Sequence, residues 1–193
     1  MEIEKQINQL IAPLKKKNNW RGVERVLRKY VDMVNPSPLY LIYYAIALYY
    51  QEQYEKALVY STMAVKADDK DPFILYHHGI ILMNNNRFND ALKAWEVILS
   101  FPKSYLTEGK YGDGRKWANS FLNNVVYYIA VTLFYKNDLA NSIKYYKRHL
   151  RNRKRGVASF KTKREVLKEL EGAVFLQKYE KKYPEKATPI LEQ

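Results

Sequence analysis

Residues 38–71 read PLYLIYYAIALYYQEQYEKALVYSTMAVKADDKD, and residues 72–101 read PFILYHHGIILMNNNRFNDALKAWEVILSF. The two segments follow each other without a gap and match at a spacing of 34 residues. The matched pairs are similar in side-chain size and polarity: Tyr54 with Phe88, Ala57 with Ala91, and Ala45 with Gly79. Similar residues at a fixed interval of this length indicate a repeated helical hairpin. The small residues let two antiparallel helices approach closely, and the aromatic residue fills the space at their turn.

This pattern resembles the tetratricopeptide repeat, which places a small residue in the first helix, an aromatic residue at the turn and Ala-x3-Phe in the second helix. Three positions depart from it: Ser61 replaces the second-helix aromatic residue, His78 replaces an aliphatic residue, and Asp69 replaces the usual closing proline. The resemblance implies a right-handed superhelix in which the first helices of the hairpins line a concave, protein-binding surface.

The same spacing predicts two further hairpins. Trp20 lies 34 residues before Tyr54 and occupies the turn position of an earlier hairpin. Leu139 lies 51 residues after Phe88 and occupies the turn position of a later one. The later interval exceeds the repeat by 17 residues, so we expect a glycine-rich insertion before the last hairpin.

A final helix is predicted by Thr162, followed three residues later by Glu165, because this pair is typical of a capping box. We therefore expect an all-α protein with a single domain over residues 1–183, built as a right-handed superhelix of about four tetratricopeptide-like hairpins and a C-terminal capping helix. Its expected parts are hairpins at about 4–37, 38–71, 72–101 and 119–151, an insertion at 102–118, a closing helix at 163–182 and a tail at 184–193.

The composition favours a folded, basic protein. Of the 193 residues, 47% are hydrophobic, which is too large a share for a disordered chain. The net charge of +13 favours an acidic partner, which can be a protein, a nucleic acid or an anionic lipid. The absence of cysteine excludes disulfides and thiolate metal sites and suits the cytoplasm, where we expect the protein. The longest apolar run, residues 39–50, is too short to predict a membrane span.

No pattern in the sequence is typical of an active site. Gly109 and Gly114 have the spacing of a phosphate-binding loop, but the Lys-Ser/Thr pair that must follow the second glycine is absent, and no strand is expected before them. His77 and His78 are adjacent, so they diverge by about 100° on a helix and cannot hold one metal ion from one face. We expect no catalytic residue, no cofactor and no metal site, and we interpret the chain as a non-catalytic interaction module.

The candidate binding surface follows from the resemblance, which places the inner positions of the first helices in a tyrosine-lined concave groove. The candidate residues for binding a protein or peptide are Tyr43, Ile46, Tyr50, Tyr76, His77, Asn84, Tyr127, Tyr128 and Tyr135. A helix as apolar as residues 39–50 needs a cover on every side. The closing helix with Leu170 and Val174, a second copy of the chain in a homodimer, or a bound peptide can supply that cover.

A basic segment offers a second interpretation. Residues 144–164 contain ten Lys and Arg residues and no Asp or Glu. Cations near aromatic rings such as Tyr111 and Trp117 are typical of a surface that binds nucleic acid. The candidate residues for binding an anion or a nucleic acid are Arg115, Lys116, Arg148, Arg151, Arg153, Lys154 and Arg155. A self-associating structural module is the third alternative.

Overall fold

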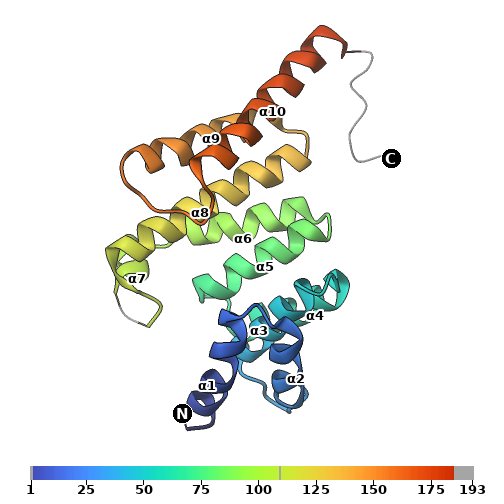
Figure 1. Cartoon of the computed structure of the whole chain (residues 1–193), viewed down its shortest axis with the longest axis vertical. Helices are drawn as coiled ribbons and strands as arrows, with labels where there is room; N and C mark the ends of the chain where they lie inside the picture. Colours follow the sequence, from blue (N-terminus) through green and yellow to red (C-terminus); the bar gives the residue numbers. More distant parts are fainter. Residues whose placement is uncertain (1, 109, 185–193) are drawn as a thin grey trace. The chain divides into compact units, whose positions relative to one another are not determined.

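The computed structural model of the chain describes residues 2–108 and 110–184, and over these residues it contains ten helices and no strand (Figure 1). The all-α prediction is therefore confirmed. The chain divides into two compact units, Met1–Arg87 and Phe88–Gln193, where the sequence predicted one domain. The boundary falls between the two helices of the hairpin predicted at 72–101.

The first unit contains five helices, each packed against the next along the chain: α1 (Glu2–Lys16), α2 (Trp20–Val31), α3 (Pro38–Tyr49), α4 (Tyr54–Ala67) and α5 (Pro72–Asn84). Helix α3 is its centre, because it contacts α2, α4 and α5. Eight of the twelve residues of α3 are buried, and the helix contains no charged residue, so it has no polar face. A helix without a polar face has to be surrounded, and its neighbours within the unit surround α3.

One turn geometry occurs at each of the predicted turn positions. Among the described residues, four that are not glycine have positive φ angles, and each lies two positions before a helix start: Asn18, Glu52, Asn86 and Asn137. In each turn the next backbone N–H donates to a leucine carbonyl five residues earlier, at 2.8–3.0 Å: Leu14, Leu48, Leu82 and Leu133. Such bonds satisfy carbonyls at the end of a helix, and asparagine tolerates the left-handed conformation that they require. The helices that follow begin at Trp20, Tyr54, Phe88 and Leu139, so the predicted turn positions are confirmed.

Two departures from the repeat pattern contact each other in the first unit. The Ser61 hydroxyl on α4 donates to the Leu58 carbonyl at 3.1 Å, and its oxygen lies 2.9 Å from Nδ1 of His78 on α5. The Ser61 hydroxyl and Nδ1 of His78 are therefore hydrogen-bond partners that join α4 to α5. A polar pair thus replaces the aromatic and aliphatic side chains that the pattern favours at these positions.

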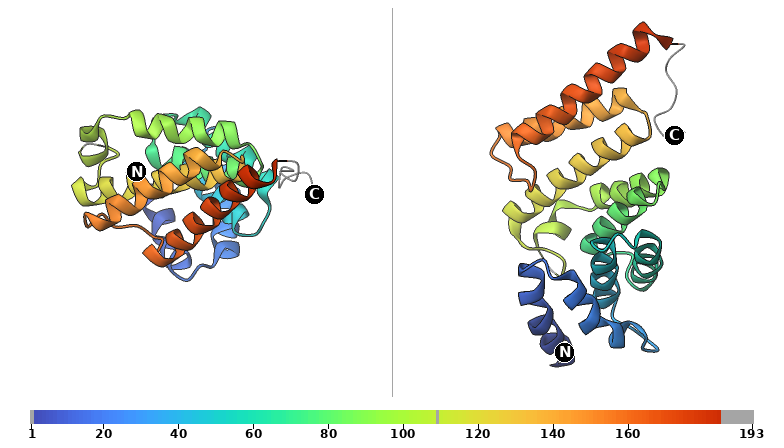
Figure 2. Two further views of the ribbon diagram at one scale, coloured as in Figure 1. Left: turned by 90° about the horizontal axis from the view of Figure 1, so that it is seen from above. Right: turned by 45° about the vertical axis from the view of Figure 1, so that its right-hand side comes forward.

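The second unit contains the remaining five helices: α6 (Phe88–Ser100), α7 (Lys103–Thr107), α8 (Gly114–Tyr135), α9 (Leu139–Lys154) and α10 (Lys163–Lys182). Helix α8 packs against α6, α7 and α9, and α9 packs against α10. Figure 2 shows α9 and α10 side by side at the C-terminal end of the described chain.

The predicted insertion at 102–118 differs from expectation. The segment forms the short helix α7 and the first residues of α8, and residues 108–113 connect the two helices. Helix α8 is 22 residues long as a result. The difference arises because the segment buries apolar side chains of its own, including Leu106 and Ala118, and because Trp117 stacks on Phe121 one turn later at 4.9 Å. Ten of the seventeen residues of the predicted insertion are therefore helical, at Lys103–Thr107 and from Gly114 onward.

The closing helix agrees with the sequence. The Thr162 N–H donates to Oε2 of Glu165 at 2.8 Å, and the Glu165 N–H donates to Oγ1 of Thr162 at 3.2 Å. This reciprocal capping box sets the start of α10 at Lys163, as predicted. Most of the predicted tail at 184–193 lies outside the described residues.

Candidate functional site

Three predicted residues of the first unit meet in one aromatic cluster. Phe73 links them, with its ring centroid 5.4 Å from that of Tyr43 and 4.5 Å from that of His77, which in turn lies 5.1 Å from Tyr76. The ammonium group of Lys15 lies 3.8 Å from the Tyr43 ring centroid. Burial, and secondly the positive charge of Lys15, lower the pKa of His77 to about 3, so its imidazole is neutral at physiological pH.

The other predicted residues of this unit differ in accessibility. Tyr50 is 57% exposed and stacks on Trp20 with ring centroids 4.4 Å apart. The Asn84 amide donates to the Ile80 carbonyl at 2.9 Å and is half-buried. Ile46 is buried in the core, so it presents almost no surface to a ligand.

In the second unit, the segment that precedes α10 covers two of the predicted tyrosines. Phe160 packs against Tyr127 at 5.5 Å and stacks on Tyr128 at 5.6 Å. Tyr127 is only 4% exposed as a result of its contacts in the unit. Leu170 and Val174 of α10 also pack against the core cluster that contains Tyr127. The sequence offered three possible covers for these tyrosines: the closing helix, a second copy of the chain or a peptide. Tyr127 and Tyr128 are covered by the closing helix and the segment that precedes it.

Beside this cover lies an open pocket of about 370 Å³. Its lining comes from α8, α9, α10 and the residue before the α10 cap: Tyr127, Val131, Phe134, Tyr135, Tyr146, Lys161, Glu169 and Gly172. We call it the aromatic pocket. Tyr135 lies at its α8 side, 49% exposed and with its ring stacked on Phe88 at 6.4 Å. Two predicted binding residues, Tyr127 and Tyr135, therefore meet at one cavity.

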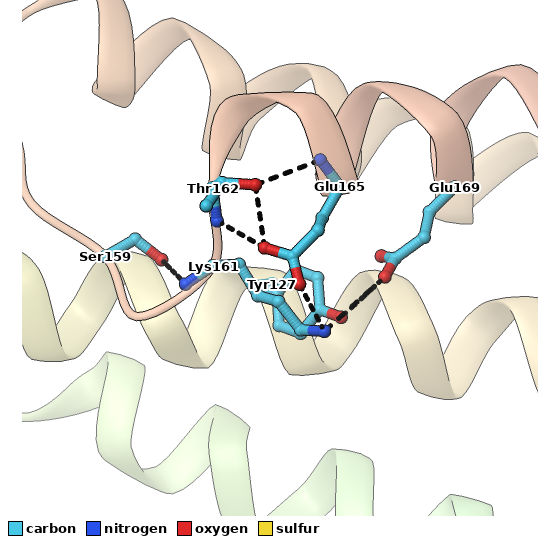
Figure 3. A network of polar contacts seen from close by, with 6 residues as sticks. All are labelled: Tyr127, Ser159, Lys161, Thr162, Glu165 and Glu169. Atoms are coloured by element: carbon cyan, nitrogen blue, oxygen red, sulfur yellow. Dashed lines mark hydrogen bonds and ion pairs between the residues drawn. The ribbon is translucent and has the colours of Figure 1, made fainter.

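Three residues that line the aromatic pocket, Tyr127, Lys161 and Glu169, belong to one network of polar contacts, which Figure 3 shows. The Tyr127 hydroxyl donates to Oε1 of Glu169 at 3.0 Å. Nζ of Lys161 lies 3.5 Å from the Glu165 carboxylate, 4.0 Å from that of Glu169 and 5.9 Å from the Tyr127 ring centroid. Burial, and secondly the negative charge of Glu169, raise the pKa values of Tyr127 and Tyr146, so both phenols keep their protons as donors.

The second carboxylate oxygen of Glu169 is the exception in this group. Oε2 is buried and has no hydrogen-bond partner among the described residues. The same carboxylate also faces the Tyr146 hydroxyl, whose hydrogen bond with Glu169 contributes to the raised pKa of that phenol. Gly172, one turn further along α10, leaves the pocket open, because a β-carbon at this position would meet no atom within 4 Å.

The predicted basic residues do not form one site. Arg115 and Lys116 lie exposed in the first turn of α8. Arg148, Arg151, Lys154 and Arg155 lie exposed in or just after α9, whereas Arg153 is half-buried and donates to the Val157 carbonyl at 3.4 Å. The rings proposed for base stacking pack on neighbours, Trp117 on Phe121 and Tyr111 on Tyr105.

The sequence interpretation missed the residues that α10 contributes to the aromatic pocket. A signal was present, because the capping box sets the helical phase and places Glu169 one turn after Glu165 on the same face as Lys161. Nothing in the sequence pattern indicated, however, that this face packs over Tyr127.

Comparison with known protein families and with curated protein sequences gives no significant match for this chain. Within residues 2–108 and 110–184, every helix is too short or too polar to cross a bilayer. In the same residues, His, Asp and Glu side chains do not gather in groups of three that could hold a metal ion.

Proposed function

We propose that the chain is a non-catalytic protein-interaction module of tetratricopeptide-like hairpins, and that the aromatic pocket binds an apolar side chain of a peptide. The observation that carries the proposal is the pocket itself, about 370 Å³, which four residues of α8 line at helical spacing: Tyr127, Val131, Phe134 and Tyr135. The recurrence of one turn geometry before Trp20, Tyr54, Phe88 and Leu139 supports the repeat interpretation.

The lining suits a peptide anchor for three reasons. The rings of Phe134 and Tyr135 offer a large contact area at a low entropic cost, as in many protein-binding surfaces. The Glu169 carboxylate lines the same wall and is an acceptor for a backbone N–H of the peptide. Lys161 stands at the same wall and can donate to a peptide carbonyl or carboxylate.

Gly172 provides a test that leaves the core untouched. A random peptide library is selected against the full chain, and enriched peptides are titrated by fluorescence anisotropy into wild type, Gly172→Ala and Gly172→Phe. A phenylalanine side chain can enter the space beside Gly172, whereas alanine adds one methyl group. We expect Gly172→Ala to bind like wild type and Gly172→Phe to bind at least about tenfold more weakly, equivalent to about 1.4 kcal/mol.

Tyr50→Ala serves as the matched control, because Tyr50 is an exposed ring of the first unit that does not line the pocket. Enriched peptides that bind all four proteins equally would place the binding site elsewhere. A library without any enriched peptide would reject peptide binding by the chain.

The two alternatives from the sequence stay predictions. For nucleic acid, binding of a single-stranded oligonucleotide should weaken steeply with salt and disappear in the triple variant Arg151→Glu, Arg153→Glu, Arg155→Glu. For self-association, sedimentation of the full chain should show a dimer. Binding that persists at high salt in the triple variant, or a monomer at every concentration, contradicts the respective alternative.

A further inference from the structure

A second pocket, of about 360 Å³, lies between α9 and α10. None of its residues lines the aromatic pocket. Four of its six residues are cations and two are leucines: Lys147, Leu150, Arg151 and Lys154 from α9, and Lys163 and Leu167 from α10. We call it the basic pocket. The sequence predicted a basic segment but not that α10 would complete a cavity beside it.

Helical spacing brings these side chains to one place. Lys147, Arg151 and Lys154 occupy positions i, i+4 and i+7 of α9, so they form one stripe along the helix. Lys163 is the first residue of α10, and Leu167 follows it one turn later on the same face. Because α9 packs against α10, the two stripes face a common space.

The cations of the basic pocket lack a counter-charge. Within residues 2–108 and 110–184, none of the four forms an ion pair, whereas Lys161 nearby in the chain pairs with Glu165. Like charges along one helix face repel each other, and a cation in the first turn of a helix also opposes the helix dipole, which is the situation of Lys163. An anion bound between the two helices would remove both penalties.

The two leucines that line the basic pocket indicate which class of anion it can bind. Leu167 is 45% exposed, and Leu150 is half-buried at the same cavity. A nucleic acid would use the cations, but it stacks its bases on aromatic rings, and the lining contains none. An acidic peptide with an aliphatic side chain uses both features, since its carboxylates face the cations while its apolar side chain covers the leucines.

We propose that the basic pocket binds an acidic peptide segment of a partner protein, which places one aliphatic side chain between Leu150 and Leu167. Carboxylates on either side of that side chain pair with Arg151 and Lys154 on α9 and with Lys163 on α10. This site is independent of the aromatic pocket, and neither proposal needs the other.

The experiment uses the full chain and two labelled synthetic peptides of equal charge, EELEELEE and EESEESEE, titrated by fluorescence anisotropy at 150 mM salt. We expect the leucine peptide to bind at least tenfold more tightly than the serine peptide. Leu167→Ser changes an exposed residue and should remove most of that preference while leaving the affinity for the serine peptide within threefold. Equal binding of the two peptides by the wild-type chain would overturn the proposal.

A second set of variants, in which two cations are replaced by glutamate, tests the role of charge in the basic pocket. Arg151→Glu with Lys154→Glu should weaken the leucine peptide at least tenfold. The matched control, Arg148→Glu with Arg155→Glu, makes the same change in net charge at exposed cations outside the pocket and should weaken it less than threefold. Equal losses in both double variants would show a general charge effect and overturn the site. The proposal is also overturned if a single-stranded oligonucleotide of equal charge binds more tightly than the leucine peptide and displaces it.

Discussion

Two glycines of the second unit should respond to the same substitution with opposite signs. At Gly172, inside α10, a β-carbon would meet no atom within 4 Å. At Gly112, before α8, a β-carbon would lie 2.2 Å from the Glu108 backbone nitrogen and 2.5 Å from its carbonyl oxygen. Alanine is therefore accommodated at Gly172 without a clash, whereas at Gly112 the connection between α7 and α8 has to move.

The magnitudes follow from these environments. Glycine in a helix interior costs about 0.5–1 kcal/mol relative to alanine, so Gly172→Ala should raise the free energy of unfolding by about that amount. For a chain of this size it corresponds to a rise in Tm of about 1–4 °C. Gly112→Ala should cost about 1–3 kcal/mol, as an overpacked site does, and lower Tm by several degrees.

The assay is thermal and urea unfolding followed by circular dichroism, with wild type and both variants measured under identical conditions. Equal helical content at low temperature serves as the control for correct folding. The reasoning is refuted if Gly172→Ala lowers Tm, because the space above Gly172 would then be occupied. A Gly112→Ala variant as stable as wild type would refute the close approach to Glu108.

Three further predictions concern stability. Ser61→Ala should lower the free energy of unfolding by about 0.5–1.5 kcal/mol by removing the hydrogen bond between the Ser61 hydroxyl and Nδ1 of His78, and Ser61→Ala with His78→Leu should cost less than the sum of the single variants; strict additivity in urea unfolding would contradict the pairing. Burial lowers the folded-state pKa of His149, so its contribution to stability is complete above pH 6.5 and is lost as pH falls below that value. His149 alone should reduce the free energy of unfolding by up to about 1.4 kcal/mol per pH unit below pH 6.5, in addition to a similar slope from His77, and a slope unchanged in His149→Gln would argue against this origin. Thr162→Ala should cost about 1 kcal/mol by removing the capping box of α10, and an unchanged midpoint in urea would show that the cap contributes nothing.

Much of the local structure was predictable, because the information lies within short stretches of the sequence. The spacing of Trp20, Tyr54, Phe88 and Leu139 located all four turns, since a helical hairpin needs its turn residue at a fixed distance from its small packing residues. The capping box located the start of α10 for the same reason, because the side chains of Thr162 and Glu165 each bond to the other residue's backbone N–H. Signals of this kind act over a few residues and depend little on the remainder of the chain.

The path of the insertion was not predictable in this way. The sequence predicted only a glycine-rich insertion, whereas the burial of Leu106 and Ala118 accompanies helices over most of it. The free energy gained by burying these side chains depends on the helices that they pack against. The local sequence pattern does not indicate which helices those are.

The sequence by itself determined the helical hairpins, their turns and the excess of positive charge. Only the tertiary structure decided which surfaces are open. It covers Tyr127 with Phe160 and Glu169, which lie more than thirty residues away in the chain, and leaves the aromatic pocket beside Gly172. It also joins cations of α9 to Leu167 of α10 in the basic pocket. The periodicity of a helix determines which of its side chains share a face. A pocket is formed by faces of two or more helices, and tertiary packing determines which faces come together.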